Sequence, residues 1–224
     1  MASGLYVTAA GVLFDMDGTL VDSTAVVETV WAEFAAEYDV DLAELLQYSH
    51  GRQALASVRR FLPDGHDPLT VTRALEAKEL ARLDGVVEIG GATQLLETLR
   101  DAPVAIVTSA PRALAEARMR ASGLALPRVI IAAEDVSTGK PSPEGYLTAA
   151  HLLGVSARDC VVFEDAEAGL RAGVASGACT VVVGTHDSAV AAGLIRILDF
   201  RAVAALIDQE TRSITLTTSR HTCR

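Results

Sequence analysis

Two aspartates at the end of an apolar run are the first residues in this sequence that could do chemistry. In the stretch VLFDMDGTLVDS, Asp15 and Asp17 flank a single methionine, and Gly18 stands directly behind them. Carboxylates this close repel each other and raise each other's pKa unless a positive charge lies between them. The stretch therefore predicts a bound cation.

Three more polar clusters follow apolar runs later in the chain. Thr108 and Ser109 follow one run, Lys140 lies in the loop after the next, and Glu164 with Asp165 ends a third. In an open parallel sheet, ligands bind at the edge where the carboxyl ends of the strands meet. Residues far apart in the sequence would then converge on one site.

Each residue type in these clusters has a task at a phosphate ester. Asp15 can act as a nucleophile that forms an aspartyl-phosphate, and Asp17 can serve as general acid and base. The Ser109 hydroxyl and the first N–H groups of the helix after it can hold phosphoryl oxygens. Lys140 supplies a fixed positive charge. Carboxylates without a nearby His or Cys favour a hard cation, and Mg²⁺ suits phosphate chemistry.

Each cluster also has a purely structural explanation. An aspartate pair after a strand often forms a turn and a helix cap, and Glu164 with Asp165 could do the same. Lys140 alone is typical of a solvated loop lysine, and a Thr-Ser pair is typical of a helix start. The occurrence of all four clusters at successive strand ends favours the catalytic interpretation.

Short apolar, β-branched runs separated by helix-like segments predict an α/β fold with a Rossmann-like parallel sheet. Continuous rather than alternating apolarity is typical of strands covered on both faces. Glycines near the ends and polar or proline residues at the starts predict the helices between them. The expected strands are residues 12–14, 104–108, 129–132, 161–163 and 180–183, and the expected helices are 111–123, 142–154 and 165–177.

A long segment between the first two strands, residues 22–88, contains no convincing strand and is expected to be helical. Ser23 is expected to cap a first helix, Asp41 and Glu44 to form a capping box, and Asp67 to start a further helix before Pro68. A parallel crossover needs only about a dozen residues, so this segment is more than a connection. We predict a helical cap domain at 22–88 inserted into a core of residues 1–21 and 89–224.

The two ends of the chain and its composition narrow the class of protein. Residues 5–14 are expected to form one first strand, and 211–224 a short strand followed by a frayed tail. The 224 residues, 50% of them hydrophobic, can bury a core, and a net charge of −10 argues against nucleic-acid or anionic-membrane partners. No apolar run approaches membrane-spanning length. Cys160, Cys179 and Cys223 lack metal-ligand spacing and are expected to be free thiols in a reducing compartment. We expect a cytoplasmic monomer.

Four segments together resemble the motifs of a known family. DMDGTLVDS, IVTSAP, GKPSPEGY and VVFEDAEAGLRAG are similar, in this order, to the four motifs of the haloacid dehalogenase (HAD) superfamily, and the resemblance covers nearly the whole chain. The helical insertion resembles the C1 cap of the sugar-phosphatase and β-phosphoglucomutase branch. Within it, SHGRQALASVRRFLPD is similar to cap segments of 2-deoxyglucose-6-phosphate and glycerol-3-phosphate phosphatases.

This resemblance assigns roles to individual residues. It implies Asp15 as nucleophile, Asp17 as acid and base, and Ser109 and Lys140 as the second- and third-motif residues. Dehalogenases lack the second aspartate, so Asp17 marks the branch that protonates an alkoxide leaving group. Mg²⁺ would be bound by Asp15, the Asp17 carbonyl and Asp165, with Glu164 assisting. The substrate would contact Gly18, Ala110, His50 and Arg52.

The implied function is a Mg²⁺-dependent phosphomonoesterase that acts on a small sugar or polyol phosphate. A β-phosphoglucomutase-like phosphotransferase is the alternative, and a non-catalytic HAD-fold binding protein is a third. The mutases usually carry a histidine where this chain has Val27, which favours hydrolysis. His50 and Arg52 could instead mark a helix boundary with a surface arginine. Gly90 and Gly91 replace the usual Pro-Gly-Ala and imply a looser hinge.

Overall fold

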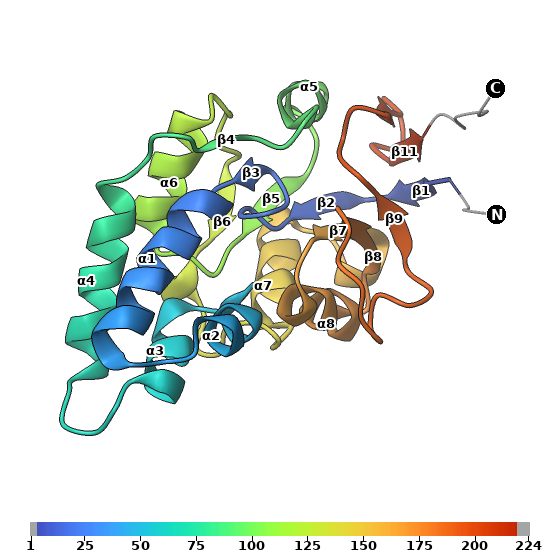
Figure 1. The fold of residues 1–224 in the computed structure, drawn as a ribbon. Coiled ribbons are helices and arrows are strands. Elements are labelled where there is room, and N and C mark those ends of the chain that lie inside the picture. The colour runs from blue at the N-terminus through green and yellow to red at the C-terminus, as the bar shows by residue number, and fades with distance from the viewer. Residues whose placement is uncertain (1–3, 219–224) are drawn as a thin grey trace, which may run out of the picture.

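The computed structural model describes residues 4–218 and contains a parallel sheet, a small antiparallel sheet and a helical insertion (Figure 1). The main sheet has six strands in the order β6-β5-β2-β7-β8-β9, and every neighbouring pair is parallel. This confirms the predicted fold class. The strands are β2 (Gly11–Phe14), β5 (Val104–Val107), β6 (Val129–Ile131), β7 (Cys160–Glu164), β8 (Cys179–Val183) and β9 (Ile195–Ile197).

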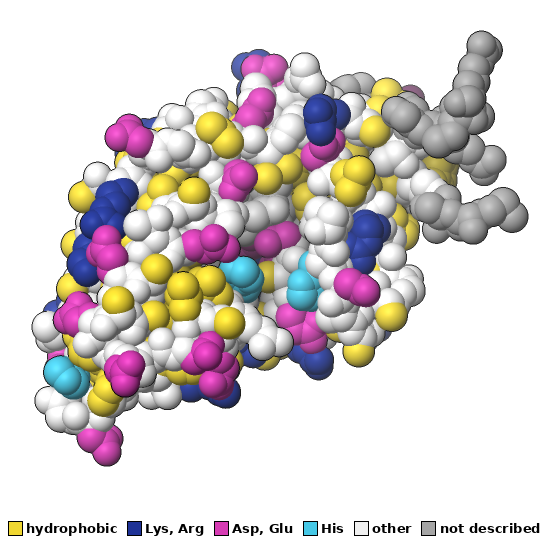
Figure 2. Space-filling view, viewed as in Figure 1, with side chains coloured by type: hydrophobic (Ala, Val, Ile, Leu, Met, Phe, Trp, Pro, Cys, Tyr) yellow, Lys and Arg dark blue, Asp and Glu magenta, His cyan; other side chains and the backbone are white. Residues whose placement is uncertain are grey.

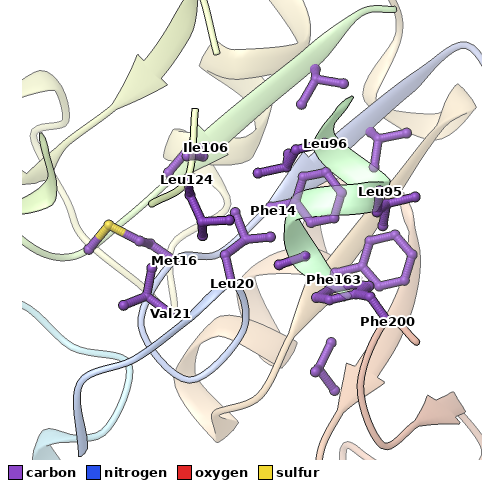
Figure 3. Packing of buried hydrophobic residues seen from close by; sticks show 14 of the residues in the cluster. Phe14, Met16, Leu20, Val21, Leu95, Leu96, Ile106, Leu124, Phe163 and Phe200 are labelled. Atoms are coloured by element: carbon purple, nitrogen blue, oxygen red, sulfur yellow. The ribbon is translucent and has the colours of Figure 1, made fainter. Parts of the chain in front are cut away.

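Apolar clusters cover both faces of this sheet. Along β2, Val12 and Phe14 belong to one cluster and Leu13 to the other, because successive side chains of a strand point to opposite faces. Helices α5 (Ala92–Thr98) and α6 (Arg112–Ala121) contribute to the first cluster, and α7 (Glu144–Leu153) and α8 (Glu167–Ser176) to the second. Figure 3 shows Phe14, Phe163 and Phe200 packed together in the first cluster, where the Phe14 and Phe163 ring centroids are 5.2 Å apart.

The helix starts differ slightly from the predicted ones, and α6 ends at Ala121, two residues early, whereas α7 and α8 end at the predicted glycines. Helix α6 begins one residue after Pro111, and α7 begins at Glu144, whose N–H donates to the Ser142 hydroxyl at 3.3 Å. Helix α8 begins at Glu167 rather than Asp165, because Asp165 is held outside the helix by side-chain contacts at the sheet edge. Gly154 and Gly177 end their helices in the left-handed conformation, as predicted.

The N-terminal segment forms two strands instead of the expected single one. β1 (Tyr6–Ala9) pairs antiparallel with β11 (Ile214–Thr218), which in turn pairs with β10 (Val203–Ile207). The chain changes partner at Ala10, whose N–H donates to the Asp159 carbonyl, and then continues as β2. The predicted C-terminal strand is confirmed as β11. The expected tail beyond it, with Cys223, lies outside the described residues.

Four helices occupy the insertion and surround an apolar cluster of their own. They are α1 (Thr24–Tyr38), α2 (Leu42–Ser49), α3 (Ala54–Phe61) and α4 (Pro68–Leu80), and they lie together at one end of the molecule in Figure 1. Trp31, Phe34 and Leu45 are among the buried residues that they share. Asp41 accepts from the Glu44 N–H at 2.8 Å, but the Glu44 carboxylate contacts Arg60, so the capping box is only half formed.

The insertion joins the rest of the chain through a ribbon that the sequence did not indicate. β3 (Val21–Asp22) and β4 (Val87–Glu88) pair antiparallel at its two ends. After β4, Gly91 has a φ of 84°, and a Cβ there would lie 2.6 Å from the Arg201 nitrogen. Close packing therefore requires this glycine, while the looser hinge stays a prediction. None of the helices within residues 4–218 is both long and apolar enough to cross a bilayer.

Candidate active site

The polar clusters meet at the carboxyl edge of the sheet, where they face the insertion across a cavity. The cavity has a volume of about 190 Å³ and is lined from the sheet by Asp15, Asp17, Ser109 and Asp165. Figure 2 shows a hollow near the middle of this face, bordered by acidic side chains and histidines. The four residues expected to contact substrate, Gly18, Ala110, His50 and Arg52, all line the cavity.

A buried group of charged side chains lies at this edge of the sheet. The Lys140 ammonium contacts Asp15 Oδ1 and lies 2.7 Å from Glu164 Oε1, and all three side chains are buried. Burial lowers the pKa of Lys140, but Asp15 and Glu164 more than reverse this effect, so its pKa lies above the usual value. Burial, with repulsion from Glu164, holds the pKa of Asp15 well above its usual range, although Lys140 opposes the rise. Lys140 is therefore an ion-pair partner of Asp15, not a solvated loop lysine.

Glu164 connects this group to neighbouring residues through hydrogen bonds. Its Oε1 also accepts from the Tyr146 hydroxyl at 2.7 Å, and its Oε2 accepts from the Asp165 N–H at 3.1 Å. A Cβ on Gly169 would lie 1.7 Å from Glu164 Oε1, so only glycine leaves room for the carboxylate. Sequence reasoning missed Tyr146, because an aromatic residue on an amphipathic helix is typical of a core position.

Three carboxylates lie close enough to share one cation. Ligand oxygens of Asp15, Glu164 and Asp165 all fall within 4.8 Å of one another. A Cβ on Gly18 would lie 2.1 Å from Asp165 Oδ2, so this glycine leaves the space that the carboxylate occupies. With one lysine against three carboxylates, the group has excess negative charge. Burial and then Glu164 raise the pKa of Asp165 to about 7, although Lys140 opposes the rise.

This donor set fits a hard divalent cation such as Mg²⁺, which prefers oxygen ligands and stabilises ionised carboxylates. Asp15 Oδ1 accepts from Lys140 and Asp165 Oδ1 accepts from Thr19, and both residues belong to the group by distance. Glu164 belongs to it by distance, but its two oxygens already accept hydrogen bonds, which fits a supporting role. The Asp17 carboxylate is outside this group of the described residues, in keeping with the backbone carbonyl expected from that position.

Asp17 points toward two hydrogen-bond donors instead. Ser23 Oγ donates to Asp17 Oδ1 at 2.6 Å, and Arg118 Nη1 donates to Asp17 Oδ2 at 2.9 Å. Ser23 stands at the predicted N-cap position of α1, but its hydroxyl bonds Asp17 and makes no cap hydrogen bond. Arg118 was also missed, although it continues the buried stripe of α6 that contains Leu114 and Ala115.

The loop between α2 and α3 rests against the sheet edge. Ser109 Oγ donates to the Gly51 carbonyl at 2.9 Å, and Gln53 Nε2 donates to the Ala133 carbonyl at 2.9 Å. The loop thereby brings His50 and Arg52 to the cavity. His50 also ends helix α2, so the helix-boundary interpretation and the lining position both hold for it. The Arg52 guanidinium lies 4.6 Å from the centre of the Tyr48 ring.

The backbone amides of two residues expected to contact the substrate are already paired. The Gly18 N–H donates to the Val21 carbonyl at 2.7 Å, and the Ala110 N–H donates to Thr108 Oγ1 at 3.1 Å. Gly18 adopts a φ of 83°, which favours glycine in this turn. Both residues therefore shape the wall of the cavity, and their contact with the substrate stays a prediction.

Known proteins share this sequence pattern and this fold. Residues 9–177 match the haloacid dehalogenase-like hydrolase family. Hexitol phosphatase A of Escherichia coli is 41% identical over 177 residues, covering 77% of this chain and 82% of that protein. 2-Deoxyglucose-6-phosphate phosphatase 1 of Saccharomyces cerevisiae is 40% identical over 202 residues, covering 80% and 81%.

A solved structure agrees with these matches. A HAD family hydrolase of Deinococcus radiodurans, crystallised with bound phosphate and sodium, superposes with a TM-score of 0.61 and 34% identity, covering 85% of this chain and 90% of that one. The family match spans most of the chain, and it contains the sheet edge and the insertion described above. The chain belongs to the haloacid dehalogenase-like hydrolases.

Proposed function

We propose that this hydrolase is a Mg²⁺-dependent phosphomonoesterase that acts on a small sugar or polyol phosphate through an aspartyl-phosphate on Asp15. The observation that carries the proposal is the buried Asp15 carboxylate, held by Lys140 beside Asp165 at the floor of a cavity. The names of the two curated relatives, a hexitol phosphatase and a 2-deoxyglucose-6-phosphate phosphatase, support this substrate class.

In the first step, an Asp15 carboxylate oxygen attacks phosphorus, and the bond to the leaving oxygen breaks. The alkoxide takes its proton from Asp17, which lines the same cavity as Asp15. The buried ammonium of Lys140 remains fixed as negative charge spreads over the phosphoryl oxygens, so no reorganisation is needed. In the second step, Asp17 takes a proton from water, which attacks phosphorus and releases phosphate from Asp15.

We propose that Asp15, the Asp17 carbonyl and Asp165 hold Mg²⁺, with Glu164 supporting Asp165 and Lys140. When bound, the cation neutralises phosphoryl charge and aligns the ester with the nucleophile. The excess negative charge of the carboxylate group and its raised pKa values support a cation at this place.

The pH dependence of Mg²⁺ binding tests this part of the proposal. Because the pKa of Asp165 is raised to about 7, its carboxyl must lose a proton before it can bind a cation at lower pH. We expect the apparent Mg²⁺ affinity to rise between pH 6 and 8, by about tenfold per pH unit below the pKa for one coupled proton. Calorimetric titrations at several pH values measure this slope.

Chelation and a ligand variant complete that test. EDTA should stop phosphate release and Mg²⁺ should restore it, with Ca²⁺ a poor substitute because of its larger and looser coordination. Asp165→Asn should weaken binding and reduce the slope with pH. Full turnover after exhaustive chelation, or an affinity independent of pH, would contradict the metal assignment.

We further propose that residues 22–88 form a cap domain that selects the leaving group. The insertion has its own apolar cluster, and it meets the core through the ribbon of β3 and β4. Its side of the cavity carries the carboxylates of Glu28 and Glu76 beside Trp31, whereas Glu79 is paired with Arg118. Carboxylates accept hydrogen bonds from hydroxyl groups and repel a second phosphate, which supports a neutral polyol or sugar moiety.

A mutase and a non-catalytic binding protein are the competing functions. A mutase returns the phosphoryl group from Asp15 to a sugar, and its cap must keep water away until then. Val27 lines the cavity at the position where such mutases carry a histidine, and its side chain cannot hydrogen-bond to a carboxylate. A non-catalytic protein would have no need of the complete set of Asp15, Asp17, Lys140 and Asp165.

The deciding experiment measures phosphate release and isomerisation side by side. With Mg²⁺ present, we expect phosphate to be released from hexose or hexitol monophosphates, and negligible conversion of β-glucose 1-phosphate to glucose 6-phosphate in an assay coupled to glucose-6-phosphate dehydrogenase. Isomerisation that outpaces phosphate release would establish the mutase. No turnover across a panel of sugar, polyol and nucleotide phosphates would favour the binding protein.

A further inference from the structure

A buried arginine on α6 lines the cavity and contacts Asp17, the proposed acid and base. Arg118 lies in the last turn of α6, and its side chain is only 3% exposed. Its Nη1 donates to Asp17 Oδ2 and its Nη2 donates to Glu79 Oε2 on α4, each at 2.9 Å. An arginine is costly to bury unless its charge is paired, so this contact is an unusual feature of an otherwise apolar helix face.

The two contacts fix the guanidinium in one orientation. The planar guanidinium has N–H donors in fixed directions. Its Nη2 is held by Glu79, and its Nη1 contacts Asp17. Arg118 Nε has no hydrogen-bond partner within the described residues, so Nη1 and Nη2 make the polar contacts of this side chain. Glu79 is itself buried and therefore anchors the arginine at the junction of α4 and α6.

Both oxygens of Asp17 are thereby held. Ser23 donates to Oδ1 and Arg118 to Oδ2, so rotation of the carboxylate would break one or both hydrogen bonds. A guanidinium can only donate, whereas a serine hydroxyl can donate or accept. Oδ2 therefore stays an acceptor whether or not Asp17 carries a proton, and Oδ1 is the oxygen that can exchange one.

We propose that Arg118 is a positioning residue that fixes the Asp17 carboxylate for proton transfer to the leaving group. The inference rests on the proposed phosphomonoesterase function, in which Asp17 is the general acid. A proton donor is effective only within hydrogen-bond reach of the leaving oxygen, and small misplacements cost much of the rate. Removal of Arg118 should therefore lower the rate of hydrolysis most for those esters whose leaving group most needs protonation.

Two aryl esters of similar shape separate this role from substrate binding and from stability. Phenyl phosphate releases a phenoxide whose conjugate acid has a pKa of about 10, and so needs protonation. p-Nitrophenyl phosphate releases a stabilised anion, which needs little protonation in order to leave. Neither ester carries sugar hydroxyls, so direct contact between Arg118 and a sugar does not contribute. The ratio kcat/KM reports the step in which Asp15 is phosphorylated.

We expect Arg118→Met to lower kcat/KM for phenyl phosphate by about tenfold or more, and for p-nitrophenyl phosphate by less than about threefold. Arg120→Met on the same helix is the matched control, because Arg120 is exposed and pairs with Glu116 of the same helix. It should leave both values unchanged. Equal losses on the two esters in Arg118→Met would overturn the proposal, as would no loss on either.

A second variant covers the case in which Arg118→Met does not fold, which circular dichroism would reveal. Arg118→Lys keeps the buried charge but donates from one nitrogen, so it cannot span Asp17 and Glu79 as the guanidinium does. The same selective loss is expected at a smaller size, and an equal effect on both esters overturns the inference. If the unmodified protein releases phosphate from no ester, the proposed function fails first and this inference fails with it.

Discussion

Asp15→Asn is expected to abolish turnover while the protein stays folded. The amide has nearly the shape of the carboxylate but is a poor nucleophile, so the aspartyl-phosphate cannot form. We expect a loss of about 10³-fold or more, measured as phosphate released per enzyme in saturating Mg²⁺. Asp84→Asn, which makes the same chemical change at an exposed position, should retain full turnover.

The stability of this variant gives an independent check. Burial and repulsion from Glu164 raise the pKa of Asp15, so its charge is unfavourable in the metal-free protein. A neutral amide removes that repulsion, and the melting temperature in EDTA should be no lower than in the unmodified protein. Mg²⁺ should then stabilise the variant less. Turnover equal to that of the unmodified protein would remove Asp15 from the mechanism.

The sheet could be predicted from the sequence because its inner strands are mostly apolar and buried. β2, β5 and β7 are buried throughout, and that pattern is visible residue by residue. The edge strand β9 has three residues with an exposed arginine in the middle, so it gave no such signal. The ribbon of β3 and β4 has two residues on each side, too few for any periodicity.

The candidate site could be predicted as far as it depends on strand ends. Asp15, Lys140 and Asp165 follow strands of one parallel sheet, so topology alone brings them to one edge. Helix packing brings in the residues that were missed. Arg118 meets Asp17 from 101 residues further along the chain, and its contact with Glu79 requires α4 beside α6. No local pattern encodes such a pairing.

Hydrogen-bond partners of polar residues were equally hidden. Ser23 stands where a helix cap is expected, but a serine hydroxyl can bond a nearby carboxylate as well as a backbone N–H. Its partner is Asp17, because a turn of the chain brings residues 17 and 23 together. Tyr146 shows the same limit, because its ring fits a core position while its hydroxyl supports Glu164.

Lys140→Met is expected to remove both activity and a large part of the stability of the metal-free protein. Without the ammonium, Asp15 and Glu164 remain buried beside Asp165 with no compensating charge. Breaking a buried ion pair by removal of one partner costs about 3–5 kcal/mol. Loss of the fixed charge at the phosphoryl group should lower kcat by about 10²-fold or more in saturating Mg²⁺.

The stability loss should depend on pH in a defined direction. Burial already raises the pKa values of Asp15 and Asp165, and the charge of Lys140 lowers them. Removal of Lys140 should therefore raise both pKa values further. A carboxyl group whose pKa is higher in the folded than in the unfolded state binds more protons when folded, so stability falls as pH rises. The melting temperature of Lys140→Met in EDTA should therefore fall further below that of the unmodified protein at pH 8 than at pH 5.5.

Lys78→Met is the matched control, because Lys78 pairs with Glu33 on the surface of the insertion and should contribute little to the stability. Mg²⁺ should restore part of the stability of Lys140→Met, since the cation replaces some of the missing positive charge. Thermal melts across pH in EDTA and in Mg²⁺ measure these effects. A melting temperature equal to that of the control in EDTA at pH 8, or turnover within tenfold of the unmodified protein, would show that Lys140 does not balance the buried carboxylates.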